Sequence, residues 1–448
     1  MPLLSIRNLK VYFKVRQGWV RAVDGVNLDM AEGETIGLVG ESGCGKTTLA
    51  YAITQLLPSN AHVLGGQILF DSKPSVERYR PEYWRLAESR MAADLGAHRP
   101  AGQDVPEPEN GGFLRRLGGG SASHGDPDYP LSKTYQHYLH AEIEALQKQV
   151  ETLEQQVEGG SRSAARPLSE ARARLSAASQ EGDMIQITRR EDGSLKEYNP
   201  KLNAIRWKQI SLVFQGAMNA LNPVYTVGHQ IVEAIQAHDD VKDNQARRRV
   251  EELFRLVGIP EDRIDNYPHE YSGGMKQRAM IAMALALNPK LVIMDEPTTA
   301  LDVITAAKIM DEVLRIQKQL KMTLIIISHD VSTVAKVADR ICVMYAGQLI
   351  EESSSKEIFH DTLHPYTEGL LGAFPNVKGE KRRLEAIPGS PPSLVTPPAG
   401  CRFHPRCKYA KDICKSTEPP YFTLGQPPHR ALCHFSTDFH AQGGLIQR

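Results

Sequence analysis

The sequence contains no long apolar run. A helix that crosses a membrane needs about 20 consecutive apolar residues, whereas the longest candidates here, Met280–Leu287 and Leu291–Met294, end at Asn288 and Asp295. The first residues also lack a charged segment followed by a long apolar one, so we expect no signal peptide. These absences predict a cytoplasmic protein, in which any role at a membrane depends on a partner.

An excess of charge is also missing, because 53 Lys and Arg balance 53 Asp and Glu. Binding to a phosphate backbone usually leaves a basic excess, so we expect no nucleic acid as partner. Six cysteines are too few for a disulfide framework in 448 residues. The apolar share of 41% is enough for a sizeable core, and the length suggests roughly two or three domains.

The order of apolar and polar residues predicts an α/β chain. Short alternating runs over residues 3–39 predict strands, the last of them buried, and residues 47–57 predict a helix. Helices are expected over residues 227–257, and buried strands over Leu291–Met294 and Thr323–Ile327.

Residues 74–199 differ from the rest of the chain in composition and in the pattern of apolar residues. Residues 98–125 are rich in Gly, Pro and Ser and have no apolar period, which predicts a loop or disorder. An apolar heptad over residues 139–157 and a helical run over residues 168–179 predict an antiparallel helical hairpin; two ordinary amphipathic surface helices are the alternative. Residues 184–198 then predict a β-hairpin.

A glycine-rich segment follows a buried strand and opens a helix. Residues 40–47 read Gly-Glu-Ser-Gly-Cys-Gly-Lys-Thr, which is the G-x-x-x-x-G-K-[ST] pattern. Glycines let backbone N–H groups approach phosphate oxygens, and the helix N-terminus adds partial positive charge. Lys46 would reach the β- and γ-phosphates, and Thr47 would offer its hydroxyl to Mg²⁺. The residues expected to bind nucleotide here are Gly40, Ser42, Gly43, Cys44, Gly45, Lys46, Thr47 and Thr48.

Two carboxylates end the apolar strand Leu291–Met294. A parallel sheet would deliver Asp295 and Glu296 beside the phosphates. Asp295 suits the Mg²⁺ shell, and Glu296 suits the polarisation of a water for attack on the γ-phosphorus. The sequence therefore predicts a nucleotide-hydrolysing enzyme.

Further motifs add a family resemblance. Residues 271–275 read Tyr-Ser-Gly-Gly-Met, residues 299–302 read Thr-Ala-Leu-Asp, Gln215 follows a short strand, and His329 lies in Ile-Ser-His-Asp. Together with the glycine-rich segment and the Asp-Glu pair, and in this order, they resemble the ATP-binding cassette (ABC) proteins. The segment at 271–275 departs from the usual signature, with Tyr where Leu is usual and Met where Gln is usual.

The resemblance implies a fold and a domain plan. We expect a P-loop NTPase of the ABC type, with a RecA-like core, an antiparallel β-subdomain and an α-helical subdomain. This domain would comprise residues 1–73 and 200–350, with the helical subdomain at about 216–285. Residues 74–199 form an insertion with no counterpart in the family pattern, and residues 351–448 form a C-terminal extension with a small cysteine module.

The resemblance also implies roles for single residues. Gln215 and His329 would act in catalysis with Glu296, and Gln215 would join Thr47 and Asp295 at Mg²⁺. The nucleotide contacts implied outside the glycine-rich segment are Phe13, Gln215, Ser272, Gly273, Gly274 and Asp302.

Adenine is expected to stack on Phe13, with Tyr12 and Trp19 as alternatives. Two ABC domains are expected to meet head to tail, so that the glycine-rich loop of one faces the signature segment of the other. This chain has one of each and therefore needs a second copy or a paralogue, of which a paralogue is favoured.

The tail resembles a narrower branch, the oligopeptide and dipeptide importers. Residues 364–371 read His-Pro-Tyr-Thr-Glu-Gly-Leu-Leu, and residues 400–434 resemble the C-terminal cysteine module of that branch. The resemblance implies an ATPase subunit at the cytoplasmic side of the plasma membrane, partnered by two permease subunits and indirectly by an extracellular substrate-binding protein. The alternatives are nickel or oligosaccharide uptake, a chromosome-structural ATPase, a soluble translation-type cassette protein, which would need two cassettes in one chain, and an iron–sulfur sensor.

The sequence leaves open which metal or cluster, if any, the cysteine module binds. It contains no C-x-x-C, which makes a zinc ribbon a poor fit, whereas four thiolates can bind a [4Fe–4S] cluster without that spacing. Some members of the branch carry such a cluster; zinc and reduced structural thiols remain alternatives, and His404, His429 or His434 could replace a ligand. The four expected cluster ligands are Cys401, Cys407, Cys414 and Cys433.

Overall fold

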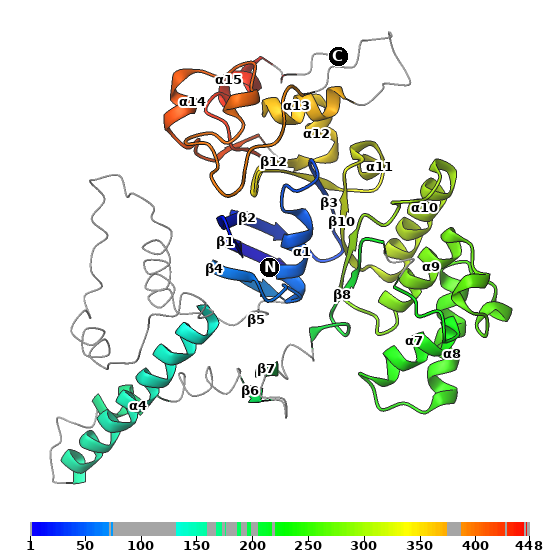
Figure 1. Ribbon diagram of the computed structural model, residues 1–448, viewed down its shortest axis with the longest axis horizontal. Coiled ribbons are helices and arrows are strands. Elements are labelled where there is room, and N and C mark those ends of the chain that lie inside the picture. The colour runs from blue at the N-terminus through cyan, green and yellow to red at the C-terminus, as the bar shows by residue number, and fades with distance from the viewer. Residues whose placement is uncertain are drawn as a thin grey trace.

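The computed structural model describes most of the chain outside the insertion (Figure 1). The described residues are 2–70, 73–74, 131–158, 167–172, 175, 186–189, 195–198, 205–216, 220–373, 387–425, 428–442 and 445. The expected loop over residues 98–125 lies outside these ranges.

The central feature of the described fold is an eight-stranded sheet in the order β13-β14-β12-β11-β3-β10-β9-β8. The strands β11, β3, β10, β9 and β8 run parallel, and β12, β14 and β13 extend the sheet antiparallel. Their bounds are β3 (Thr35–Val39), β8 (Ile210–Val213), β9 (Leu291–Asp295), β10 (Thr323–Ser328), β11 (Arg340–Tyr345), β12 (Gln348–Ser354), β13 (Phe422–Leu424) and β14 (His429–Ala431).

The parallel strands are apolar throughout because both of their faces are covered. Side chains of a strand alternate between faces, and in β10 Leu324 and Ile326 join one apolar cluster while Ile325 and Ile327 join the other. Every residue of β9 and β10 is buried. The buried parallel strands predicted from the apolar runs are therefore present.

A second, antiparallel sheet covers one face, in the order β2-β1-β4-β5. Its strands are β1 (Leu4–Val15), β2 (Gly18–Met30), β4 (Ala61–Phe70) and β5 (Lys73–Pro74). Helix α1 (Lys46–Thr54) lies between the two sheets, where Leu49 and Ile53 pack with Leu28, Ile36 and Ile325 (Figure 1). The helix ends before the predicted residue 57 because Gln55 adopts a left-handed φ of 57°.

Helices cover the other face of the sheet and build the part that Figure 1 draws in green. The bounds are α7 (Val227–Gln236), α8 (Asp243–Leu256), α9 (Gly273–Ala284), α10 (Val303–Leu320) and α11 (Val331–Ala335). In α8 the buried residues are Ala246, Val250, Leu253 and Phe254, which form one apolar stripe at helical spacing. Two 3₁₀ turns, Glu261–Arg263 and Pro268–Glu270, connect α8 to α9.

The insertion contains a long helix, α4 (Leu131–Glu158), which projects from the body of the molecule (Figure 1). Val150 packs against Leu168 and Ala171 of the following helical segment, and Arg172 pairs with Glu154 at 2.6 Å. These contacts join α4 to the helical segment at residues 167–172, and the antiparallel direction of the pair stays a prediction. The strands β6 (Gln186–Arg189) and β7 (Leu195–Tyr198) pair antiparallel as the predicted hairpin requires.

The C-terminal extension packs on the β12 end of the main sheet (Figure 1). Strand β14 joins the sheet by pairing with β12, with Glu351 opposite Ala431. The helical elements of this region are α12 (Ser355–His360), α13 (Pro365–Gly372), the 3₁₀ turn His404–Arg406, α14 (Asp412–Ser416) and α15 (Ser436–Ala441).

Candidate functional site

The glycine-rich loop curls around the side chain of Lys46. Helix α1 begins at this lysine, directly after β3 and the loop. The Lys46 Nζ donates to the backbone oxygens of Gly40 at 2.8 Å and Glu41 at 2.9 Å, and only 6% of the residue is exposed. The positive head group is thus held inside the loop, at the start of a helix whose free N–H groups attract anions.

Two glycines of this loop cannot be replaced without distortion. Gly40 has a φ of 151° and Gly45 a φ of 108°, where side chains are strained. A Cβ on Gly40 would lie 2.2 Å from the Met344 backbone oxygen, and one on Gly45 would lie 2.0 Å from the Ala22 oxygen. Their places in the motif therefore have a steric cause.

Asp295 lies at the end of β9, fully buried, and neither of its carboxylate oxygens has a hydrogen-bond partner among the described residues. Burial raises the pKa of Asp295, and the nearby Thr47 hydroxyl and Lys46 ammonium act in the opposite direction. A buried carboxylate without donors is costly unless a cation compensates it. The carboxylate of Asp295 and the nearby Thr47 hydroxyl together offer oxygen ligands, which Mg²⁺ prefers.

Glu296 is the centre of a polar cluster. Its Oε2 accepts from Gln215 Nε2 at 3.0 Å and from Thr299 Oγ1 at 2.9 Å, and its Oε1 lies 3.3 Å from His329 Nδ1. The Glu296 backbone has a φ of 47° and its N–H donates to the Ile327 oxygen at 2.9 Å. The structure therefore brings together the three residues expected to act in catalysis, which lie at the ends of neighbouring strands β8, β9 and β10.

The signature segment lies at the start of α9. Ser272 is the N-cap and its Oγ accepts from the Met275 N–H at 3.3 Å, while Gly273 and Gly274 form the first turn. Ser272 and Gly273 are exposed. Among the described contacts, no hydrogen bond or ion pair joins this segment to the glycine-rich loop of the same chain.

Asp302 caps the next helix, α10. Its carboxylate accepts from the N–H groups of Ile304 at 3.1 Å and Thr305 at 2.9 Å, and the Thr305 bonds hold the pKa of Asp302 below its usual value. The side chain is thereby fixed as an anion close to the start of α9, where a Cβ on Gly274 would lie 2.9 Å from Thr305 Cγ2.

The aromatic candidates for adenine differ in their surroundings. Tyr12 is buried and donates from its hydroxyl to Asp24 at 2.8 Å. Trp19 packs edge-on against His62, with ring centroids 5.1 Å apart. Phe13 is half-buried on β1, opposite Val20 and Ala61. Tyr12 is therefore engaged in the fold, whereas Phe13 keeps part of its ring accessible.

The tail supplies contacts to the glycine-rich loop that the sequence did not predict. Arg406 forms a bidentate ion pair with Glu41, at 2.8 and 3.0 Å. The Tyr366 hydroxyl accepts from the Glu41 N–H at 2.9 Å. Arg402 donates to the Ala346 oxygen at 2.5 Å and also to Asp24. The only signal for these contacts in the sequence is an arginine placed among cysteines, and it does not indicate which residue the arginine binds.

Cys401, Cys407, Cys414 and Cys433 all line one cavity. Four aromatic rings complete much of its apolar wall: Phe403, Tyr409, Phe435 and Phe439. His404 and His434 also line it, but His429 does not. The expectation that His429 could serve this site is wrong, because its ring bonds to Glu351 on β12 instead.

The model of the ABC transporter family matches residues 23–190 and 183–299. The chain belongs to the ABC transporter family. The model described as the oligopeptide/dipeptide transporter C-terminal region matches residues 350–414 of this ABC protein.

Named relatives align over much or nearly all of the ABC chain. It is 31% identical to the dipeptide transport ATP-binding protein DppD of Caldanaerobacter subterraneus, over 96% of both chains. It is 34% identical to the oligopeptide transport ATP-binding protein OppD of Bacillus subtilis, over 94% of this chain and 86% of that protein. It is 47% identical to DppD of Haemophilus influenzae, over 53% of this chain and 72% of that protein.

Membership of the ABC transporter family identifies the reaction of this chain as ATP hydrolysis. The predicted fold class and ATPase activity are confirmed by the match to the ABC transporter family, and the parallel strands around β3 agree with a P-loop NTPase fold. Within the described residues, no helix combines the length and apolar character that a membrane crossing requires.

Proposed function

We propose that the chain is the ATP-hydrolysing subunit of an importer for dipeptides or oligopeptides. The observation that carries this proposal is the C-terminal region, because residues 350–414 match the oligopeptide/dipeptide transporter model. Relatives named for dipeptide and oligopeptide transport align over more than nine-tenths of the chain, which supports the same cargo class.

Each residue of the ATP site has a proposed role. Lys46 and the loop N–H groups bind the β- and γ-phosphates, Phe13 stacks on adenine, and Ser42, Gly43, Cys44 and Thr48 complete the phosphate contacts. Thr47, Gln215 and Asp295 hold Mg²⁺, which neutralises phosphate charge when bound. Glu296 accepts a proton from the attacking water, and His329 and Gln215 hold Glu296 in position.

The signature segment is proposed to act on a second subunit. Ser272 and Gly273 are exposed at the start of a twelve-residue helix, which can bind the γ-phosphate held by another chain. We propose a paralogue as that partner, with Asp302 and Gly274 at the same interface. ATP would then close the dimer and hydrolysis would open it.

The assembly is proposed to act at the cytoplasmic side of the plasma membrane. Helices α7, α8 and α9 would offer a groove to a short helix of one of the two permease subunits. Gln215, which bonds Glu296, precedes this helical region and would couple it to the metal site. An extracellular substrate-binding protein would deliver cargo, and nucleic acid has no part.

We also propose a [4Fe–4S] cluster on Cys401, Cys407, Cys414 and Cys433. The four thiols surround a common cavity, yet no three of their sulfurs lie within 4.8 Å of one another among the described residues. Tetrahedral zinc would need sulfurs roughly 3.8 Å apart, because Zn–S bonds are about 2.3 Å. The wider spacing favours a cluster, whose four irons separate the ligands.

The cluster proposal has its own test. Anaerobically purified protein should contain about four iron and four sulfide per chain and should absorb in the visible range. Single Cys→Ser variants should lose iron, whereas Cys342→Ser, a buried cysteine on β11, should keep it. Stoichiometric zinc without iron, or reduced thiols without metal, would refute the cluster.

The importer is tested by reconstitution with its permeases and partner ATPase in vesicles. ATP-dependent uptake of a labelled dipeptide is expected, and Lys46→Ala should abolish it because phosphate binding is lost. Uptake of nickel or an oligosaccharide without peptide uptake would assign a different cargo. ATP hydrolysis without any association with permeases would refute the transport role.

A further inference from the structure

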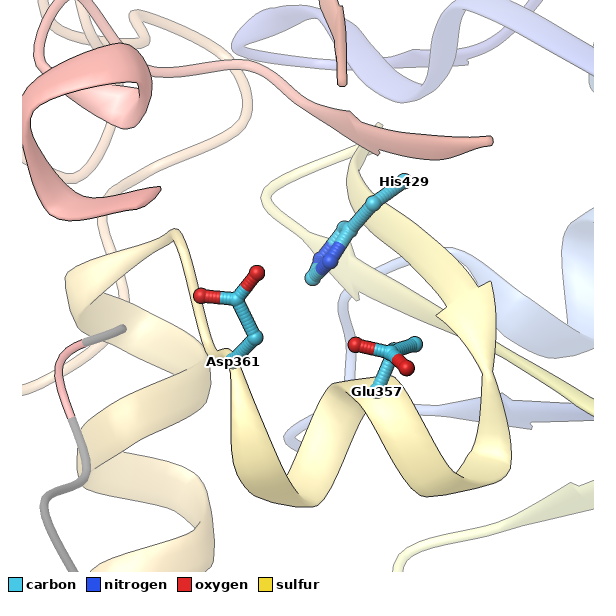
Figure 2. Close-up of side chains that lie close together, drawn as sticks. All are labelled: Glu357, Asp361 and His429. Carbon is cyan, nitrogen blue, oxygen red and sulfur yellow. The ribbon is translucent and has the colours of Figure 1, made fainter. Parts of the chain in front are cut away.

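Three potential metal ligands meet at the junction between α12 and the C-terminal segment. Glu357 lies on α12, Asp361 follows it, and His429 begins β14. Each offers one ligand atom, and these atoms lie within 4.8 Å of one another. Figure 2 shows the imidazole of His429 pointing into the space between the two carboxylates.

His429 carries an unpartnered nitrogen in a buried position. Only 3% of the residue is exposed, and its Nδ1 has no hydrogen-bond partner within the part of the chain that the structure describes. The other nitrogen, Nε2, lies 2.8 Å from Oε1 of Glu351, a carboxylate that also accepts from the N–H groups of Leu363 at 2.7 Å and His364 at 3.1 Å. With three donors, Glu351 remains an acceptor, so the proton of a neutral His429 lies on Nε2 and the lone pair on Nδ1.

Asp361 is arranged in the same way. Its Oδ1 is buried and has no hydrogen-bond partner in the described ranges, while its Oδ2 lies 2.6 Å from Nδ1 of His440 on α15. One oxygen is thus oriented by a neighbour and the other is left available. Two ligands that are each held by a second residue are typical of metal sites, because such partners fix ligand direction and basicity.

We propose that Glu357, Asp361 and His429 bind a divalent transition-metal ion of the zinc class. One imidazole and two carboxylates suit Zn²⁺ and its neighbours, whereas Mg²⁺ and Ca²⁺ prefer oxygen ligands alone. Zinc bonds of about 2.0–2.2 Å place tetrahedral ligands roughly 3.4 Å apart, so small side-chain rotations complete the site. This site is separate from the ATP site and from the four cysteines, and it does not depend on the proposed transport role.

The ion would fasten the C-terminal segment to the ATPase body. Glu357 and Asp361 belong to the element that follows β12, whereas His429 and the orienting His440 belong to the segment that contains Cys433. Among the described residues, β14 pairs with β12 over Glu351–Ala431 and Glu352–Arg430, and the next residue, Leu432, donates its N–H to the Ile350 oxygen at 2.7 Å. A metal that bridges α12 and β14 would stabilise this short pairing.

The test is a metal titration of the full chain after removal of bound metal by chelation. A variant with all four module cysteines changed to Ser should still bind one equivalent of Zn²⁺. Glu357→Gln and Asp361→Asn should each weaken this binding by at least about tenfold, and His440→Ala by about tenfold, because outer partners contribute 10- to 100-fold. His360→Gln, an exposed potential ligand on the same helix, should change nothing.

Cobalt keeps the proposal testable if the four-serine variant does not fold. In the unmodified chain, Co²⁺ at the proposed site should add one bound equivalent without the near-ultraviolet charge-transfer bands that cysteine ligation gives. The double variant Glu357→Gln/Asp361→Asn should lose only that equivalent and keep the near-ultraviolet bands. Cysteine-bound Co²⁺ alone in the unmodified chain, or an equal number of bound Co²⁺ equivalents in the double variant, would overturn the site.

Discussion

Two polar regions of the molecule are built in opposite ways. Around Glu296, single hydrogen bonds of 2.9 to 3.3 Å connect Gln215, Thr299 and His329, and 60% of the His329 side chain is exposed. Where the tail meets the glycine-rich loop, Arg406 binds Glu41 through two bonds and only 6% of its side chain is exposed.

The difference follows from what each region has to do. Catalytic groups must rearrange around phosphate, water and a second subunit, so an exposed and lightly bonded cluster can change at small cost. The tail junction has no such task, and buried charges are tolerated only when they are paired and hydrogen-bonded. Changes at the first region should therefore alter turnover, and changes at the second should alter stability.

The largest difference between the effects of substitutions in the two regions is expected for Glu296→Gln. The amide cannot accept the proton of the attacking water, so turnover should fall by about 10²- to 10⁴-fold. ATP binding should persist, since Lys46 and the loop are untouched, and the ATP-bound dimer should accumulate. Phosphate release and size-exclusion chromatography with ATP measure the two effects.

The matched control for this change is Glu261→Gln, an exposed acid on a 3₁₀ turn of the helical region. It should leave both turnover and dimerisation unchanged. Normal turnover in Glu296→Gln would show that Glu296 does not accept the proton of the attacking water. A loss of folding stability instead of turnover would contradict the difference inferred between the two regions.

At the tail junction, Arg406→Met is expected to destabilise the fold by about 2 kcal/mol, because it leaves the carboxylate of Glu41, which is 27% exposed, without its bidentate partner. Urea unfolding of Arg406→Met, Glu41→Gln and the double variant gives the coupling energy of the pair. The exposed bidentate pair Arg247–Asp265 provides the control, and its loss should cost less than about 1 kcal/mol. Additive effects at Arg406 and Glu41 would show that their contact is not energetically coupled.

The same contrast explains what the sequence could predict. The phosphate loop occupies consecutive residues 40–48, and Glu296 directly follows an apolar strand, so local spacing was enough to assign them. Arg406 and Glu41 are 365 residues apart and meet because the segment around Arg406 packs against the ATPase body, where Arg402 also bonds Ala346. No local pattern encodes that pairing, just as none linked His429 to Glu351 across 78 residues.

An effect no larger than that of Arg406→Met is expected from His364, which is buried at the start of α13 and accepts the Tyr366 N–H at its Nδ1. Burial lowers the pKa of His364 from 6.5 to about 4, and the charge of Glu351 opposes that shift. The unfolded chain binds a proton near pH 6.5 that the folded chain refuses until about pH 4. Stability is therefore fully present above pH 6.5 and falls as the pH is lowered toward 4.

Between pH 7 and pH 5 this histidine should account for a loss of about 2 kcal/mol. His364→Asn keeps a capping side chain without a titrating ring, so its unfolding free energy should fall less over the same interval. Urea unfolding at the two pH values, compared with the unmodified chain, measures the difference. Equal pH dependence in both proteins would show that His364 is protonated in the folded state.

The smallest effect is expected from removing residues 98–179 and joining the ends with a short Gly-Ser linker. Val150 of α4 packs in one apolar cluster with Leu168 and Ala171, and α4 approaches the ATPase body at β4, whereas the glycine-rich loop follows β3. Independent sites usually change one another by less than about 0.5 kcal/mol, so ATP affinity should stay within roughly twofold. A larger loss of nucleotide affinity would make the insertion part of the ATPase fold, since the glycine-rich loop itself is unchanged by the deletion.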